Sequence, residues 1–159
     1  MGLKIDILFN NAGIATPNHP KDMMACMQTN LIGTMVMTQR FLPLMEKGDK
    51  IIVNMSSVVA SIENTFGCQG AMGNRGCYRT SKCAGNMLSR TFAAELDGRD
   101  YKVIAISPGH VATEMGTSGG RSAPLTIDMS CAGMLKVIAN LEKTDNGKFI
   151  EFDGSILPW

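Results

Sequence analysis

A tyrosine and a lysine four residues apart, Tyr78 and Lys82, are the residues of this chain best suited to chemistry. Four-residue spacing places two side chains on the same face of a helix. An ammonium beside a phenol favours the phenolate, so we expect the pKa of Tyr78 to fall from about 10 toward neutrality. A phenol tuned in this way can exchange a proton with a carbonyl oxygen. The spacing alone is equally typical of a packed aromatic residue beside a solvated lysine.

Further polar residues follow apolar runs that would carry them to the same crevice. Asn-Asn-Ala-Gly at 10–13 follows the apolar run 5–9, Ser56-Ser57 follows 51–55, and Pro108-Gly109 follows 103–107. Asn30 lies within a helical pattern. Because the carboxyl ends of parallel strands meet at one edge of a sheet, these residues are expected to converge there.

The elements that would position these residues alternate along the chain. Runs rich in β-branched or apolar residues at 5–9, 51–55, 103–107 and 148–152 predict buried parallel strands. Helical patterns occupy 23–45, 78–96 and 128–141, and the glycine-rich stretches 67–76 and 116–120 are expected to be loops. The alternation predicts an α/β fold with right-handed crossovers. With no repeat or linker in view, residues 1–159 are expected to form a single domain.

Composition excludes several classes of partner. The 159 residues are 45% hydrophobic and 18% charged, which suits one soluble globular domain. The net charge of +1 offers no electrostatic argument for nucleic acid or an anionic membrane as a partner. Without a signal peptide or a long apolar run, a cytoplasmic location is expected. The five cysteines lack zinc-ligand spacing, so we expect reduced thiols and no metal site.

Over nearly its whole length the chain resembles the short-chain dehydrogenase/reductase family, and within it the sniffer and C-factor type of carbonyl reductase. The motifs that carry this resemblance are Asn-Asn-Ala-Gly at 10–13, the Tyr-x-x-x-Lys pair at 78–82 and the Pro-Gly turn at 108–109. The resemblance implies a partial Rossmann-like, doubly wound parallel sheet of about four strands with helices on both faces. It further implies NAD(P)H-dependent reduction of an aldehyde, ketone or quinone, with NADP favoured over NAD.

The resemblance also implies roles for particular residues. Tyr78 would protonate the carbonyl oxygen, Ser57 would orient it, and Lys82 would lower the pKa of Tyr78 and hold the nicotinamide ribose. Asn30 would support an ordered water through which protons reach Lys82. Taken singly, Asn30 is equally compatible with a polar residue satisfied in its helix, and Ser57 with a turn-capping hydroxyl. The residues expected to contact the cofactor are Asn10, Ala12, Gly13, Tyr78, Lys82, Pro108, Gly109, Val111 and Thr113. Substrate selection would fall to the loops 61–77 and 114–124.

One departure from the family pattern shapes these expectations. Family members begin with a strand and a glycine-rich TGxxxGxG turn that cradles the pyrophosphate, and these 159 residues contain no such segment. The glycine-rich stretch 70–76 follows no strand, so we do not count it as a phosphate loop. Strand 5–9 is then expected to be an open edge, cofactor affinity to be low, and turnover by the chain alone to be slight or nil.

Two alternatives stay open at this stage. One is a catalytically inactive short form that binds a full-length reductase partner through the long helices, and the open edge of the sheet separately favours a homodimer through the same helices. The other is a flavin or nucleotide binder on a similar sheet, which the lack of a phosphate loop disfavours.

Overall fold

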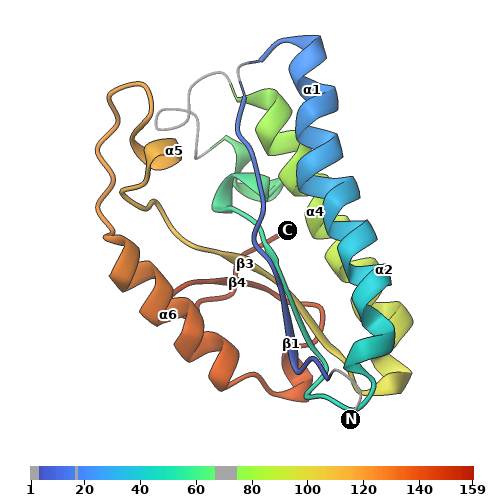
Figure 1. Cartoon of the computed structure of the whole chain (residues 1–159). Helices are drawn as coiled ribbons and strands as arrows, with labels where there is room; N and C mark the ends of the chain where they lie inside the picture. Colours follow the sequence, from blue (N-terminus) through green and yellow to red (C-terminus); the bar gives the residue numbers. More distant parts are fainter. Residues whose placement is uncertain (1–3, 17, 67–74) are drawn as a thin grey trace.

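A four-stranded parallel sheet forms the centre of the molecule (Figure 1). The computed structural model describes residues 4–16, 18–66 and 75–159. The strands are β1 (Ile7–Asn10), β2 (Ile51–Met55), β3 (Lys102–Ser107) and β4 (Phe149–Glu151), and they lie side by side in that order. They confirm the predicted strands and the predicted Rossmann-like α/β class. β1 is an edge strand, as expected, and the side chain of Ile7 is 44% exposed.

Helices connect the strands at the places that the sequence indicates. The described α-helices are α1 (Pro20–Met27), α2 (Thr34–Met45), α4 (Gly76–Leu96), α5 (Glu114–Thr117) and α6 (Ile127–Ala139). A π-helical turn, η1 (Gln28–Gly33), joins α1 to α2, and 3₁₀ turns occupy η2 (Val58–Ala60), η3 (Glu63–Thr65), η4 (Asp97–Arg99) and η5 (Lys143–Asp145). None of the described helices has the length and apolar character needed to cross a membrane.

Two helix predictions need correction. The first helix begins at Pro20 rather than at residue 23, because proline suits the first helical position and the ring of His19 accepts a hydrogen bond from the Lys21 amide. The glycine-rich stretch 116–120 is not wholly a loop, since Gly116 lies in α5. The hydroxyl of Thr113 caps that helix by accepting from the Gly116 amide at 3.0 Å. Residues 67–74 of the other predicted loop, 67–76, lie outside the described residues, and its last residue, Gly76, belongs to α4 rather than to a loop.

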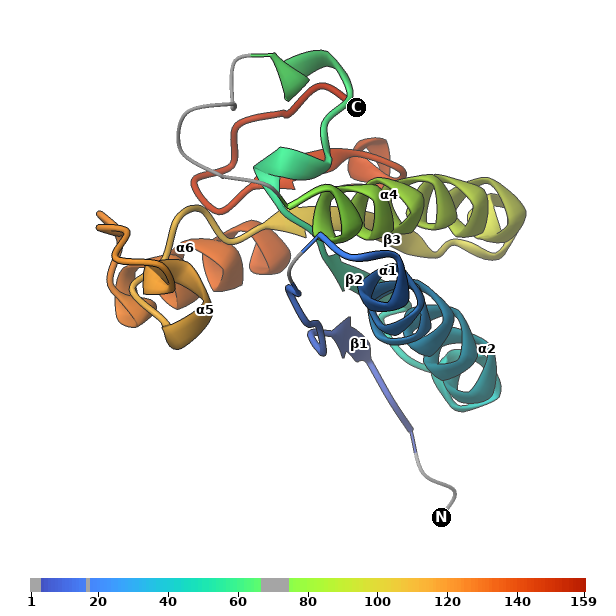
Figure 2. The same ribbon diagram turned by 90° about the horizontal axis from the view of Figure 1, so that it is seen from above.

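Helices cover both faces of the sheet (Figure 2). Successive strand residues point to opposite faces, and the register pairs Ile52 with Val103 and Val53 with Ile104. Ile52 and Val103 pack against apolar residues of α2 and α4, whereas Val53 and Ile104 pack against apolar residues of α6. The central strands β2 and β3 are therefore buried on both sides, which explains why they appear in the sequence as largely apolar runs.

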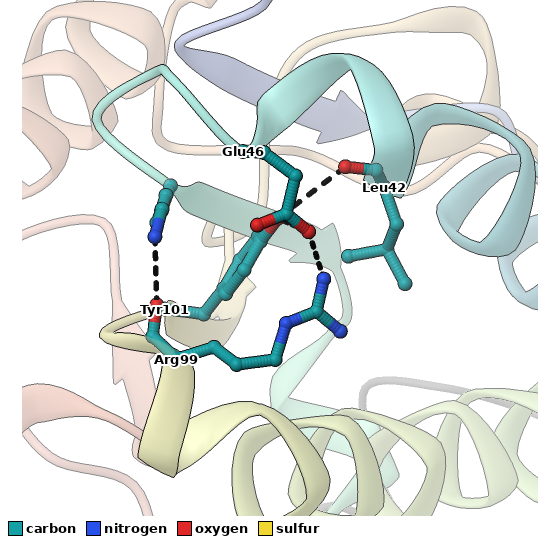
Figure 3. A network of polar contacts seen from close by, with 5 residues as sticks. Leu42, Glu46, Arg99 and Tyr101 are labelled. Atoms are coloured by element: carbon teal, nitrogen blue, oxygen red, sulfur yellow. Dashed lines mark hydrogen bonds and ion pairs between the residues drawn. The ribbon is translucent and has the colours of Figure 1, made fainter.

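A polar network fastens the amino ends of β2 and β3 to the end of α2 (Figure 3). The Arg99 guanidinium pairs with the Glu46 carboxylate, and the Lys50 ammonium donates to the Arg99 carbonyl at 3.0 Å. The buried Tyr101 donates its hydroxyl proton to the Leu42 carbonyl at 3.4 Å. This network holds the base of the sheet, and the opposite, carboxyl ends of the strands are left to form a site.

Candidate active site

A cavity of about 530 Å³ opens where β1, β2 and β3 end. Its walls come from the segments that follow these strands, from the start of α4, and from α5 and α6. The residues predicted to act there that do line the cavity are Ala12, Gly13, Ser57, Tyr78, Lys82, Pro108, Gly109, Val111 and Thr113. Asn10 and Asn30 are not among the described residues that line it. The site that the topology predicts at the carboxyl ends of the strands is thus present as a cavity.

Tyr78 reaches the cavity from the first turn of α4 and lines it together with Ser57, whose hydroxyl favours the phenolate form of Tyr78. The predicted fall of its pKa is wrong in direction. Burial raises the pKa of Tyr78 above its ordinary value, and the Ser57 hydrogen bond and the positive charge of Arg75 offset only part of that rise. The four-residue spacing identified a neighbouring cation but carried no information on how deeply the phenol is buried.

Lys82 lies one turn further along α4 and is only 4% exposed. Its Nζ donates to the Met55 carbonyl at 2.6 Å and lies 5.9 Å from the centre of the Tyr78 ring. Burial lowers the pKa of this ammonium to about 8. The Lys82 ammonium therefore loses its proton, and with it its charge, when the pH rises through about 8.

Gly13 borders Lys82 where the chain leaves β1. A Cβ at this position would lie 3.2 Å from Lys82 Nζ and 3.3 Å from Asn30 Oδ1, so a side chain here would crowd both groups. The glycine therefore keeps open the space beside the ammonium.

Ser57 is held by the ends of three strands. The amide of Val58 donates to the Ser107 hydroxyl at 3.0 Å, and that hydroxyl donates to the Glu151 carboxyl at 3.1 Å. Burial raises the pKa of Glu151, while the bond from Ser107 opposes the rise. The chain of contacts runs from β4 through β3 to the residue beside Ser57, so it holds the backbone that carries the serine.

Asn30 sits in the π-helical turn and is buried beneath the cavity wall. Its Oδ1 accepts from the Ile14 amide at 2.8 Å, and its Nδ2 donates to the Ile14 carbonyl at 2.9 Å and to the Ser81 hydroxyl at 2.8 Å. The side chain thus joins the segment after β1 to α4. A π-helical turn at such a position is typical of functional sites.

Asn10, at the end of β1, lies within the sheet. Its Nδ2 donates to the Asn54 side chain at 2.8 Å and to the Thr38 hydroxyl at 3.1 Å. Asn54 in turn donates to the Ser89 hydroxyl at 2.9 Å. These contacts brace β1 against β2, α2 and α4, and a cofactor contact of Asn10 stays a prediction.

The start of α4 is anchored by a residue that the sequence did not single out. The side chain of Asn18 accepts from the Cys77 amide at 2.9 Å, which caps the helix from outside it. A Cβ on Gly76 would lie 2.8 Å from the same Asn18 oxygen, so the close approach needs a glycine. No local sequence signal marks this cap, because its two parts are far apart in the chain.

The cavity also contains charged residues that the sequence analysis missed. Arg75 and Arg121 both line it, and they fall within the loops 61–77 and 114–124 that were expected to select the substrate. No carboxylate is among the described residues that line the cavity. In the described part of the chain, no group of three or more His, Cys, Asp or Glu side chains could hold a metal ion, and Cys26, Cys77, Cys83 and Cys131 are free thiols.

Comparison with known proteins agrees with this architecture. A family model described as short chain dehydrogenase matches residues 2–122. The NADPH-bound carbonyl reductase from chicken fatty liver superposes with a TM-score of 0.90 at 33% identity, over 99% of this chain and 67% of that one. The carbonyl reductase Sniffer of D. melanogaster gives a TM-score of 0.88 at 30% identity, over 98% of this chain and 67% of that one. The C-signal protein of Myxococcus xanthus is 31% identical over 98% of this chain and 93% of its own length. The chain belongs to the short-chain dehydrogenase family.

Proposed function

We propose that this chain is the catalytic portion of an NADP(H)-dependent carbonyl reductase that acts on an aldehyde, ketone or quinone. The observation that carries the proposal is that Ser57 and Tyr78 line the same cavity and influence one another, with the buried Lys82 ammonium one helical turn away. Two hydroxyls at one point can bind a single carbonyl oxygen. The chicken fatty liver reductase, which is similar over 99% of this chain, is described as NADPH-bound.

The residues present fit a nicotinamide cofactor. Gly13 leaves open the space beside Lys82, which a larger residue would fill. We assign the ribose to Lys82 and Tyr78, and the nicotinamide to the turn after β3. The remaining residues assigned to the cofactor are Asn10, Ala12, Gly13, Pro108, Gly109, Val111 and Thr113. When bound, the nicotinamide supplies the hydride that reduces the carbonyl carbon.

The side chains of the chain would supply the proton and hold the oxygen. Ser57 and Tyr78 donate hydrogen bonds to the carbonyl oxygen, and negative charge develops on that oxygen as its carbon is reduced. Tyr78 then transfers its proton to the oxygen, which gives the alcohol and leaves a phenolate. Its raised pKa suits this role, because the phenol keeps its proton until the oxygen becomes basic enough to take it. The Arg75 charge favours the phenolate that remains.

Reprotonation of Tyr78 would proceed through Lys82. The pKa of about 8 allows this ammonium to release a proton near neutral pH, and its contact with the Met55 carbonyl fixes its position. We assign Asn30 to the support of the water that connects Lys82 with solvent. Its Oδ1 and Lys82 Nζ both face the space over Gly13.

Titration of the purified chain with NADPH and with NADH, followed by fluorescence, tests the cofactor assignment. We expect weak binding, because the sequence contains no glycine-rich pyrophosphate turn. We expect NADPH to be preferred, because the similar chicken fatty liver reductase is described as NADPH-bound. Reduction of a panel of aldehydes, ketones and quinones should then be slow and should fall about a hundredfold or more in Tyr78→Phe. Tyr101→Phe is the matched control, since Tyr101 lies in the network at the far end of the strands.

The outcomes separate the proposal from its alternatives. Reduction that persists in Tyr78→Phe would refute the catalytic assignment, and reduction at ordinary enzyme rates would refute the expected impairment. Absence of nucleotide binding together with capture of a full-length reductase would favour the inactive short form. Two observations favour testing this alternative. The edge strand β1 is open, with Ile7 44% exposed, and the Myxococcus xanthus relative matches this chain over 93% of its own length.

A further inference from the structure

Two arginines from distant segments meet at one wall of the cavity. Arg75 lies three residues before Tyr78, and Arg121 lies in the segment that connects α5 to α6. Both guanidinium groups donate to the Ser118 hydroxyl, Arg75 at 2.6 Å and Arg121 at 3.1 Å. Arg121 also donates to the Ser118 carbonyl at 2.9 Å and to the Met115 carbonyl at 2.7 Å. Its guanidinium is therefore fixed in place beside that of Arg75.

No acidic group compensates this pair of charges. In the described part of the chain neither arginine forms an ion pair, and no aspartate or glutamate lines the cavity. The segment 67–74 contains no acidic residue by sequence. Burial lowers the pKa of Arg75, and the nearby charge of Arg121 lowers it further. The wall thus holds two like charges close together in a partly buried place.

A purely structural role explains this arrangement poorly. If the pair only fastened the α5 segment to α4, neutral side chains could bind Ser118 without mutual repulsion. Arg75 has five N–H donors, and among the described residues it makes one side-chain hydrogen bond, to Ser118, while it lines the cavity. A guanidinium fork of this kind matches the two oxygens of a carboxylate.

The place of the pair along α4 separates it from the cofactor residues. Lys82 lies one turn after Tyr78 and faces Gly13, where we assign the cofactor. Arg75 lies before Tyr78, on the side of Ser118 and Arg121. A substrate whose carbonyl lies at Ser57 and Tyr78 would extend from that point toward the two arginines.

We propose that Arg75 and Arg121 bind a carboxylate of the substrate, so that the chain selects carbonyl compounds that carry an acid group a short distance from the carbonyl. This inference rests on the proposed carbonyl reductase function. It names the substrate class of that site, and it gives these arginines a role in substrate specificity.

Equilibrium binding of matched probes tests the inference without requiring turnover. The probes are 4-acetylbenzoate and its neutral counterpart 4-acetylbenzamide, titrated into the ¹⁵N-labelled chain at low salt and followed by NMR. The benzoate should bind about tenfold or more tightly than the amide, and Arg75→Gln or Arg121→Gln should each weaken benzoate binding about tenfold. Binding of the amide should change less than about twofold. Added salt should weaken benzoate binding only.

Controls distinguish a binding role from a structural one. Arg40→Gln removes an exposed arginine of α2 outside the cavity and should leave both affinities unchanged. Arg75→Lys keeps the charge but loses the fork, so it should retain part of the preference for benzoate. The inference would be refuted if the folded glutamine variants bound the benzoate and the amide more weakly by the same factor. It would also be refuted if these variants bound NADPH more weakly but the benzoate as tightly as the parent chain does.

The result is also separable from the proposed function. Preference for the benzoate in a chain that reduces neither probe would support the arginine site and count against the reductase. Equal reduction of both ketones with NADPH would support the reductase and refute the arginine site.

Discussion

Replacement of the buried ammonium by an apolar side chain of similar length, Lys82→Met, should stabilise the protein at neutral pH. Lys82 is only 4% exposed, and its charge is opposed by burial. Methionine fills nearly the same space without a charge. The residue that we assign to cofactor binding and proton supply is thus expected to weaken the fold, as is common at functional sites.

The change in the pKa of Lys82 on folding gives the size of the expected stabilisation. Its ordinary value of 10.5 falls to about 8 in the folded chain. At about 1.4 kcal/mol per pH unit, this difference corresponds to about 3 kcal/mol of free energy. The native state releases the proton near pH 8 and the unfolded state near pH 10.5, so between these values the unfolded state binds more protons. The stability contributed by this residue therefore rises with pH across that window.

Urea unfolding followed by circular dichroism at pH 7, 8, 9 and 10 measures this effect. The free energy of unfolding of Lys82→Met should exceed that of the parent chain at pH 7, by up to about 3 kcal/mol less the lost hydrogen bond to Met55. The excess should shrink by about 1.4 kcal/mol per pH unit above pH 8. Lys136→Met, in an exposed part of α6, is the control that measures how much of the change in unfolding free energy comes from the lost net charge alone. An excess that stays constant from pH 8 to pH 10 would refute the reasoning.

Three further predictions follow from single contacts. Asn30→Ala should lower the free energy of unfolding by about 3 kcal/mol in urea, because it leaves the buried Ile14 and Ser81 groups unpaired, whereas Asn140→Ala, in an exposed position, should have little effect. Gly109→Ala should destabilise the chain by about 2 kcal/mol more than Gly119→Ala. The two glycines share a positive φ, of 76° and 75°, but only at Gly109 would a Cβ meet Leu125 at 2.5 Å; equal losses in the two variants would contradict this packing. Reductase activity should decline as the pH rises through about 8, since Lys82 then loses its charge, and activity that increases over this range in a pH profile would contradict the role of the ammonium.

The sheet was predictable because its strands are buried on both faces. Runs such as 51–55 are therefore mostly apolar, with Asn54 as a hydrogen-bonded exception, and their bounds in the sequence match β2 (Ile51–Met55). β1 ends one residue later than predicted because Asn10 still pairs in register with Asn54, which no propensity would indicate for an asparagine.

The π-helical turn could not be predicted from local sequence. It surrounds Asn30, whose hydrogen bonds run to Ile14 and Ser81, at 16 and 51 residues' separation. These partners are set by the tertiary structure, so a helical pattern over 23–45 gives no sign of the interruption.

The sequence predicted most of the candidate site residues to lie at the carboxyl ends of the strands, where they line the cavity, but it did not predict their electrostatics. Motifs identified Tyr78, Lys82 and Ser57, but the direction of the pKa of Tyr78 depends on burial, which spacing does not reveal. Arg75 and Arg121 escaped notice because they lie in separate irregular loops and meet only in the folded chain.

Transfer of deuterium tests the central claim most directly, that Ser57, Tyr78 and Lys82 form a carbonyl-reducing site. The chain at high concentration is incubated with an aldehyde and NADPH deuterated at C4 of the nicotinamide, and the alcohol is analysed by mass spectrometry, which detects even slow turnover. We predict deuterium on the carbinol carbon with the parent chain and with Tyr101→Phe, and none above background with Tyr78→Phe. Equal deuterium with and without the Tyr78 hydroxyl, or none with any folded variant at saturating NADPH, would contradict the account.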